Sequence, residues 1–106
     1  MKQIRFIKNE AGNTIDGTLR IIGKYLFFKY KNNQQNQKVI QEFKSKGLNI
    51  ETSKDWIKVD LLGNHESIKL GEIIIESNED ANLIEDKLYN FYKGQYKKMG
   101  FVLMES

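Results

Sequence analysis

The chain lacks cysteine and proline altogether and has a single histidine among its 106 residues. Without thiols it can form neither disulfides nor thiolate metal sites, and one imidazole by itself is a poor transition-metal site. Neither G-x-x-x-x-G-K-[ST] nor G-x-G-x-x-G occurs, so the usual glycine-rich phosphate loops are excluded. We therefore expect no catalytic residue, no metal and no cofactor, and we expect that the chain is not an enzyme.

Long apolar runs are also missing, since no stretch approaches the ~20 residues that a membrane-spanning helix needs. The first residues, Met-Lys-Gln-Ile-Arg-Phe-Ile-Lys, are too short and too interrupted by charge for a signal peptide. Hydrophobic residues make up 40% and charged residues 29%, as in globular proteins. The sequence predicts a single domain over residues 1–106, no membrane partner and, by default, a cytoplasmic location.

The net charge of +3 is unevenly distributed along the chain. Residues 1–50 carry ten Lys and Arg against three Asp and Glu, whereas residues 51–106 carry seven against eleven. This asymmetry indicates either a basic face for an acidic partner or two halves that neutralise each other once folded. The abundance of Lys, Asn and Ile, whose codons are AT-rich, favours a low-GC genome or a mobile element.

The first third of the chain has the period-2 pattern of β-strands. We predict strands over Lys2–Asn9, Thr14–Ile22 and Lys24–Lys31, with a turn at residues 10–13 between the first two. Gly17 interrupts the second strand, which indicates a bulge or a close backbone approach. Three consecutive strands favour an antiparallel meander.

The middle of the chain changes period and then returns to short β segments. A helix is predicted over Gln35–Lys46, because Val39, Ile40 and Phe43 share one helical face. The next segments are predicted as a hairpin followed by one strand bent at Gly71; their ranges are Leu48–Thr52, Trp56–Leu62 and Ser67–Glu76.

The last third contains the best-marked helix. Ser77 followed by Asp80 resembles a capping box at the start of this helix, and Gly100 is a residue type at which helices commonly end. The inward stripe at helical spacing consists of Ile84, Leu88, Phe91 and Tyr92. Phe101–Glu105 is predicted as a closing strand or an apolar tail.

The predicted order is β-β-β-α-β-β-β-α with an optional final strand. Strands paired in sequence and helices set apart are typical of an α+β protein, here an antiparallel sheet of about six strands covered by two helices. The element order also resembles two known folds. From Lys24 onward it is similar to a ferredoxin-like arrangement, and a bent sheet closed by the last helix would be pleckstrin-homology-like.

The histidine is a candidate for acid–base or metal chemistry. The carboxylate pairs Glu72 with Glu76 and Glu85 with Asp86 are too generic to support glycosyl chemistry. His65 lies in the turn Gly63-Asn64-His65-Glu66, with Asp60 shortly before it. A histidine beside carboxylates can act in proton transfer or bind a metal. With no second histidine or thiolate available, we interpret His65 as an exposed turn residue.

The third strand carries the first candidate binding surface. If Leu26, Phe28 and Tyr30 form the core face, alternation places the other face outward; its residues are Tyr25, Phe27, Lys29 and Lys31. Rings and lysines arranged in this way bind single-stranded nucleic acid, because bases stack on the rings and lysines meet phosphates. The alternative is that both faces of the strand are covered.

The end of the last helix carries the second candidate surface. Tyr89, Lys93 and Tyr96 follow i, i+4, i+7 spacing and therefore share one side of the helix. Tyrosine is a favoured interface residue, because it buries area with little loss of entropy. A solvated amphipathic face is the alternative interpretation.

Together these observations favour a small non-enzymatic binding protein that occludes or adapts a macromolecular partner. Inhibitors, immunity proteins and anti-defence proteins are of this kind. We expect a protein partner, and the alternative is a nucleic-acid-binding module that uses a basic and aromatic face of the sheet.

Overall fold

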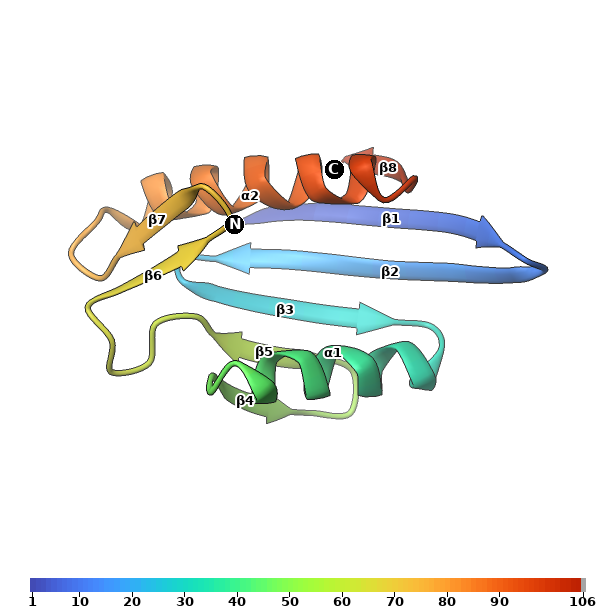
Figure 1. The fold of residues 1–106 in the computed structure, drawn as a ribbon, viewed down its shortest axis with the longest axis horizontal. Coiled ribbons are helices and arrows are strands. Elements are labelled where there is room, and N and C mark those ends of the chain that lie inside the picture. The colour runs from blue at the N-terminus through green and yellow to red at the C-terminus, as the bar shows by residue number, and fades with distance from the viewer. Residues whose placement is uncertain (106) are drawn as a thin grey trace.

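The computed structural model describes residues 1–105, which contain two helices and eight strands (Figure 1). In chain order they are β1 (Lys2–Glu10), β2 (Asn13–Ile22), β3 (Tyr25–Tyr30), α1 (Asn33–Ser45), β4 (Asn49–Thr52), β5 (Ile57–Asp60), β6 (Ser67–Leu70), β7 (Ile73–Glu76), α2 (Ala81–Lys98) and β8 (Val102–Glu105). The predicted α+β class and the broad element order are confirmed.

The main sheet has six strands in the order β4-β5-β3-β2-β1-β8, and every neighbouring pair is antiparallel. The β1–β2 hairpin turns tightly through Ala11 and Gly12, whose φ angles of 50° and 83° suit such a turn. The closing strand predicted over Phe101–Glu105 forms as β8 and pairs with β1. This pairing excludes the ferredoxin-like alternative, in which the last strand would pair with strands after Lys24.

Both helices pack on the same face of the sheet. Helix α1 contacts β3, β4 and β5, while α2 contacts β1, β2 and β8 (Figure 1). The side chains of the strands that face the helices join one hydrophobic core with those of the helices; its most deeply buried members are Ile4, Phe6, Leu19, Ile21, Leu26, Leu61, Leu62, Val59, Ile75 and Leu88. The main sheet has β4 and β8 as its two edge strands and is not closed on itself, which also differs from the pleckstrin-homology-like alternative.

The segment Ser67–Glu76 is a hairpin and not the single bent strand that the sequence predicted. Strands β6 and β7 pair with each other in a separate two-stranded sheet. The reason is Gly71, whose φ of 57° reverses the chain, where a bent strand would continue. The reversal brings Leu70 and Ile75 into the core.

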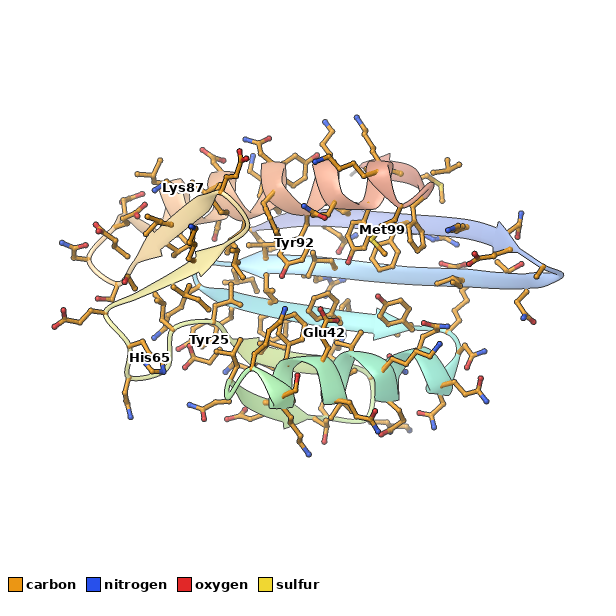
Figure 2. The ribbon with its side chains drawn as sticks, in the orientation of Figure 1. Tyr25, Glu42, His65, Lys87, Tyr92 and Met99 are labelled. Carbon is orange, nitrogen blue, oxygen red and sulfur yellow. The ribbon has the colours of Figure 1, made fainter. Side chains whose placement is uncertain are left out.

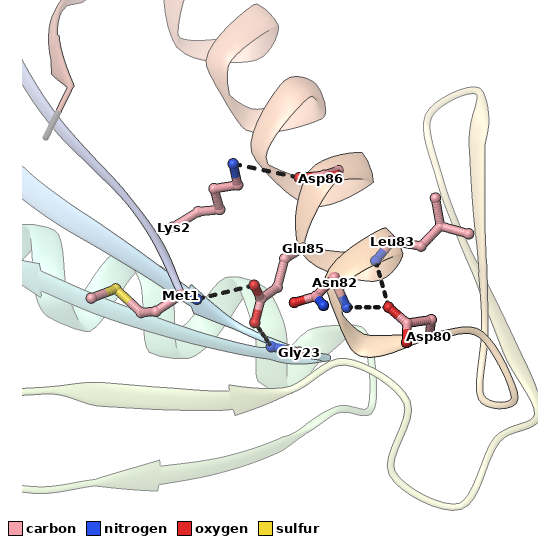
Figure 3. A network of polar contacts seen from close by, with 8 residues as sticks. All are labelled: Met1, Lys2, Gly23, Asp80, Asn82, Leu83, Glu85 and Asp86. Atoms are coloured by element: carbon pink, nitrogen blue, oxygen red, sulfur yellow. Dashed lines mark hydrogen bonds and ion pairs between the residues drawn. The ribbon is translucent and has the colours of Figure 1, made fainter.

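The start of α2 also differs from the prediction. The N-cap is Asp80 and not Ser77, because the Asp80 carboxylate accepts the backbone N–H groups of Asn82 at 2.9 Å and Leu83 at 3.4 Å (Figure 3). Aspartate caps a helix as well as serine does, so the sequence offered two adequate caps. The stripe predicted for this helix faces the core: Ile84 and Leu88 are buried, and Phe91 and Tyr92 are partly buried against them.

Candidate functional site

One face of the six-stranded sheet is left without a helix in the described residues 1–105, and we call it the open face. On β3, Leu26 and Phe28 are buried under the helices and Tyr30 packs against the core. Strand alternation therefore turns the next residues the other way. Tyr25 and Phe27 lie half-buried on the open face, and Lys29 and Lys31 lie exposed there.

The neighbouring strands add cations and a further ring that sequence reasoning missed. Arg20 on β2 places its guanidinium 4.5 Å from the centroid of the Trp56 ring, and Lys29 Nζ lies 5.5 Å from the same centroid. Lys58 on β5 places its ammonium 4.5 Å from the centroid of the Tyr25 ring. The open face thus pairs aromatic rings with positive charge, an attractive arrangement because the ring face is electronegative.

Acidic side chains neutralise only part of this charge. The Asp16 carboxylate lies 3.0 Å from both the Arg5 Nη2 and the Lys31 Nζ atoms. The hydrogen bond from Arg5 is the main reason why the pKa of Asp16 lies below its usual range. Within residues 1–105, no carboxylate lies within 4.0 Å of the charged nitrogens of Arg20 or Lys29. These cations are therefore available to an anionic partner.

A shallow hollow lies beside Trp56 on the open face. Its volume is about 260 Å³, and its walls include Arg5, Thr18, Lys29 and Lys31. The hollow therefore combines one large ring with cations and a hydroxyl group, so it can hold a planar or anionic group.

The second surface predicted from the sequence, on α2, is not assembled. Tyr96 is 6% exposed, and its ring stacks on that of Phe6 with a centroid distance of 4.1 Å. The Phe101 ring, placed by the turn into β8, lies 5.5 Å from it. Tyr89 and Lys93 do stay together, since Lys93 Nζ lies 5.6 Å from the centroid of the Tyr89 ring. The prediction of Tyr96 as a surface residue is therefore wrong.

A groove of about 580 Å³ runs between α1 and α2 above the sheet. Its walls combine aromatic rings with polar and aliphatic side chains, and Figure 2 shows Tyr92 and Met99 of the α2 side facing Glu42 of α1 across it. Burial raises the pKa of Tyr30 to about 12, and burial also raises the pKa values of Tyr92 and Tyr96 above the ordinary value for tyrosine. These hydroxyl groups therefore stay protonated in the folded protein up to strongly alkaline pH.

This tyrosine cluster predicts that the fold loses stability in alkaline solution. An unfolded tyrosine ionises near pH 10, whereas folding holds Tyr30 protonated up to about 12. The unfolded state therefore releases protons first, and the stabilisation present below pH 10 is lost as the pH rises toward 12. Melting curves over this range should show a steep fall for wild type and a shallower one for Tyr96→Phe. Identical pH dependence of the two proteins would contradict this account.

Of the two residues considered for acid–base or metal chemistry, Asp60 has a structural role and His65 is an exposed turn residue. Asp60 accepts the backbone N–H groups of Leu62 and Gly63 at 3.2 and 2.8 Å, so it holds the turn. His65 is exposed in that turn. In the part of the chain that the structure describes, no three His, Asp or Glu side chains gather where they could hold a metal ion.

The most buried acid, Glu85 on α2, is a structural anchor. One of its carboxylate oxygens lies 3.1 Å from the amino nitrogen of Met1, and the other accepts the Gly23 N–H at 2.8 Å (Figure 3). Burial alone would raise the pKa of Glu85, but these two donors hold it below its usual range. The residue ties α2 to the start of β1 and to the β2–β3 turn.

Neither helix of residues 1–105 is long and apolar enough to cross a membrane. Comparison of the chain with protein-family models, curated proteins and solved structures finds no match.

Proposed function

We propose that this protein is a small non-enzymatic binding protein that docks an anionic macromolecule on its open face and thereby occludes or adapts it. Inhibitors, immunity proteins and anti-defence proteins act in this way. The observation that carries the proposal is the set of cations over aromatic rings on the sheet face that the helices leave uncovered. Lys58 has one carboxylate partner, Glu51 at 4.0 Å, whereas Arg20 and Lys29 have none within residues 1–105. A cytoplasmic location belongs to the same proposal.

The chemistry of the open face supports an interface. Tryptophan, tyrosine and arginine are the residue types that contribute most to binding energy, because each buries a large area and keeps a polar contact. Here Arg20 and Trp56 already contact each other, so little side-chain freedom remains to be lost on binding. A sheet face that contacts only water is expected to carry polar side chains and not the rings of Tyr25, Phe27 and Trp56.

Charge reversal on the open face tests the proposal with heparin as an anionic probe. The variant Lys29→Glu, Lys58→Glu leaves Lys31 and its ion pair with Asp16 untouched. We expect it to elute from immobilised heparin at lower salt than wild type, with the slope of log retention against log salt reduced by about 2. Melting curves should show the variant folded with a modest loss of stability, because Lys58→Glu lies opposite Glu51 across β4 and β5, whereas the exposed Lys29 contributes little.

The matched control is Lys38→Glu, Lys97→Glu, which makes the same change in net charge on the exposed surfaces of α1 and α2. It should elute close to wild type. Equal retention of the two double variants would mean that heparin responds to net charge alone, and the open face would then not be the docking site.

A further inference from the structure

The register of the sheet arranges the rings of the open face in a row. Tyr25 and Phe27 are two residues apart on β3, a spacing of about 7 Å. Ile57 pairs with Phe28 in antiparallel register, so Trp56 lies one step further on, beside Lys29. We call Tyr25, Phe27 and Trp56 the ring row of the open face.

Cations flank every member of the ring row. Phe27 pairs with Arg20 on one neighbouring strand and with Lys58 on the other. Arg20 and Lys29 lie over the ring of Trp56, and Lys58 lies over that of Tyr25. A partner that covers the rings therefore brings its own charges within reach of the cations.

From this alternation we infer that the partner docked by the open face is single-stranded nucleic acid. Unpaired bases stack on the ring row, and the phosphates between them meet Arg20, Lys29 and Lys58. Stacking tolerates any base, since every base has a flat face, so binding depends little on sequence. This inference rests on the proposed function and names the partner.

Duplex nucleic acid and acidic proteins fit the open face less well. In a duplex the flat faces of the bases are already stacked on one another, which leaves the ring row without a partner. An acidic protein surface would satisfy the cations but presents carboxylates to the rings. The structure thus favours nucleic acid over the protein partner that the sequence favoured, because Arg20, Trp56 and Lys58 join the residues of β3.

The test uses Trp56, the only tryptophan of the chain, as a built-in reporter. Oligothymidylate and oligouridylate of about 12 nucleotides are titrated into the protein at low salt while its intrinsic fluorescence is recorded. We expect quenching by both single strands and weaker binding with rising salt. The slope of log affinity against log salt should be about −2, from three phosphate contacts.

Substitution of the reporter separates stacking from charge. Fluorescence anisotropy of a labelled oligothymidylate should show binding to Trp56→Ala weakened about tenfold. Trp56→Phe should retain most of the affinity, since a ring remains, and the Lys38→Glu, Lys97→Glu control should bind as wild type does. Melting curves establish that each variant is folded.

The outcomes distinguish the inference from the proposed function. Equal affinity for a duplex or for polyglutamate would overturn the inference, as would an unchanged affinity of folded Trp56→Ala. If the oligonucleotides fail to bind while heparin retention still depends on Lys29 and Lys58, the inference fails and the proposed function stands. If heparin retention is also indifferent to those lysines, both fail.

Discussion

We expect the Leu88→Ala variant to lose about 2–5 kcal/mol of its free energy of unfolding. Leu88 lies at the centre of α2, is 0% exposed and belongs to the hydrophobic core. Truncation removes its buried methyl groups and leaves a cavity that the sheet on one side and the rest of the helix on the other cannot close. For a domain whose whole stability is about 5–15 kcal/mol, the loss is large.

Urea unfolding curves measure this loss, and α2 provides a matched control. Leu83→Ala makes the same chemical change in the same helix at a side chain that is 49% exposed. It should change stability by no more than about 0.5 kcal/mol. If the two variants unfolded at the same urea concentration, α2 would not pack against the sheet through Leu88.

The strands and the core face of the sheet could be predicted because their signals are local. Alternation within β3 suffices to separate Leu26 and Phe28 from Tyr25 and Phe27, and the structure buries the first pair. The spacing in α2 likewise identifies Leu88 as inward. The spacing of apolar residues predicts the buried face of an element without any knowledge of distant segments.

Some local patterns fit two different structures, and the sequence alone could not distinguish between them. Gly71 is compatible with a bent strand and with a hairpin, and only the pairing of β6 with β7 separates them. Ser77 and Asp80 are both adequate caps, and in the structure it is the Asp80 carboxylate that accepts the first helical N–H groups. Helical spacing predicted that Tyr96 shares a surface with Tyr89, but the turn into β8 places Phe101 against the Tyr96 ring.

Only part of the candidate site could be predicted from the sequence, because strand alternation is local whereas the pairing of distant strands is not. Residues of one strand, such as Phe27 and Lys29, follow from alternation. Arg20, Trp56 and Lys58 belong to other segments, and only the registers of β2 and β5 against β3 bring them beside these residues. Arg20 is the exception, because a tight antiparallel turn at Gly23 between β2 and β3 would have predicted that Arg20 lies opposite Phe27.

The second large effect is expected at Gly17, where even one added methyl group should destabilise the fold. Glycine within a strand usually costs about 0.5–1 kcal/mol relative to alanine, so the substitution would ordinarily stabilise. Here a Cβ atom would lie 2.6 Å from Cζ of Phe6 and 2.9 Å from Cδ1 of Tyr30. Phe6 pairs with Gly17 across β1 and β2, and its ring is held by Tyr96 and Phe101.

We therefore expect Gly17→Ala to lower the free energy of unfolding by about 1–3 kcal/mol, the usual cost of overpacking a core. Gly94→Ala is the control with the opposite sign: a Cβ there meets nothing within 4 Å, and in α2 the change should stabilise by about 1 kcal/mol.

Combining Gly17→Ala with Phe6→Leu tests the cause, because a smaller side chain makes room for the methyl group. The double variant should lose less stability than the sum of the two single losses. Strict additivity, or a stabilised Gly17→Ala, would show that the Phe6 ring can move aside, and the close approach of ring and backbone would then not define the register of β1 against β2.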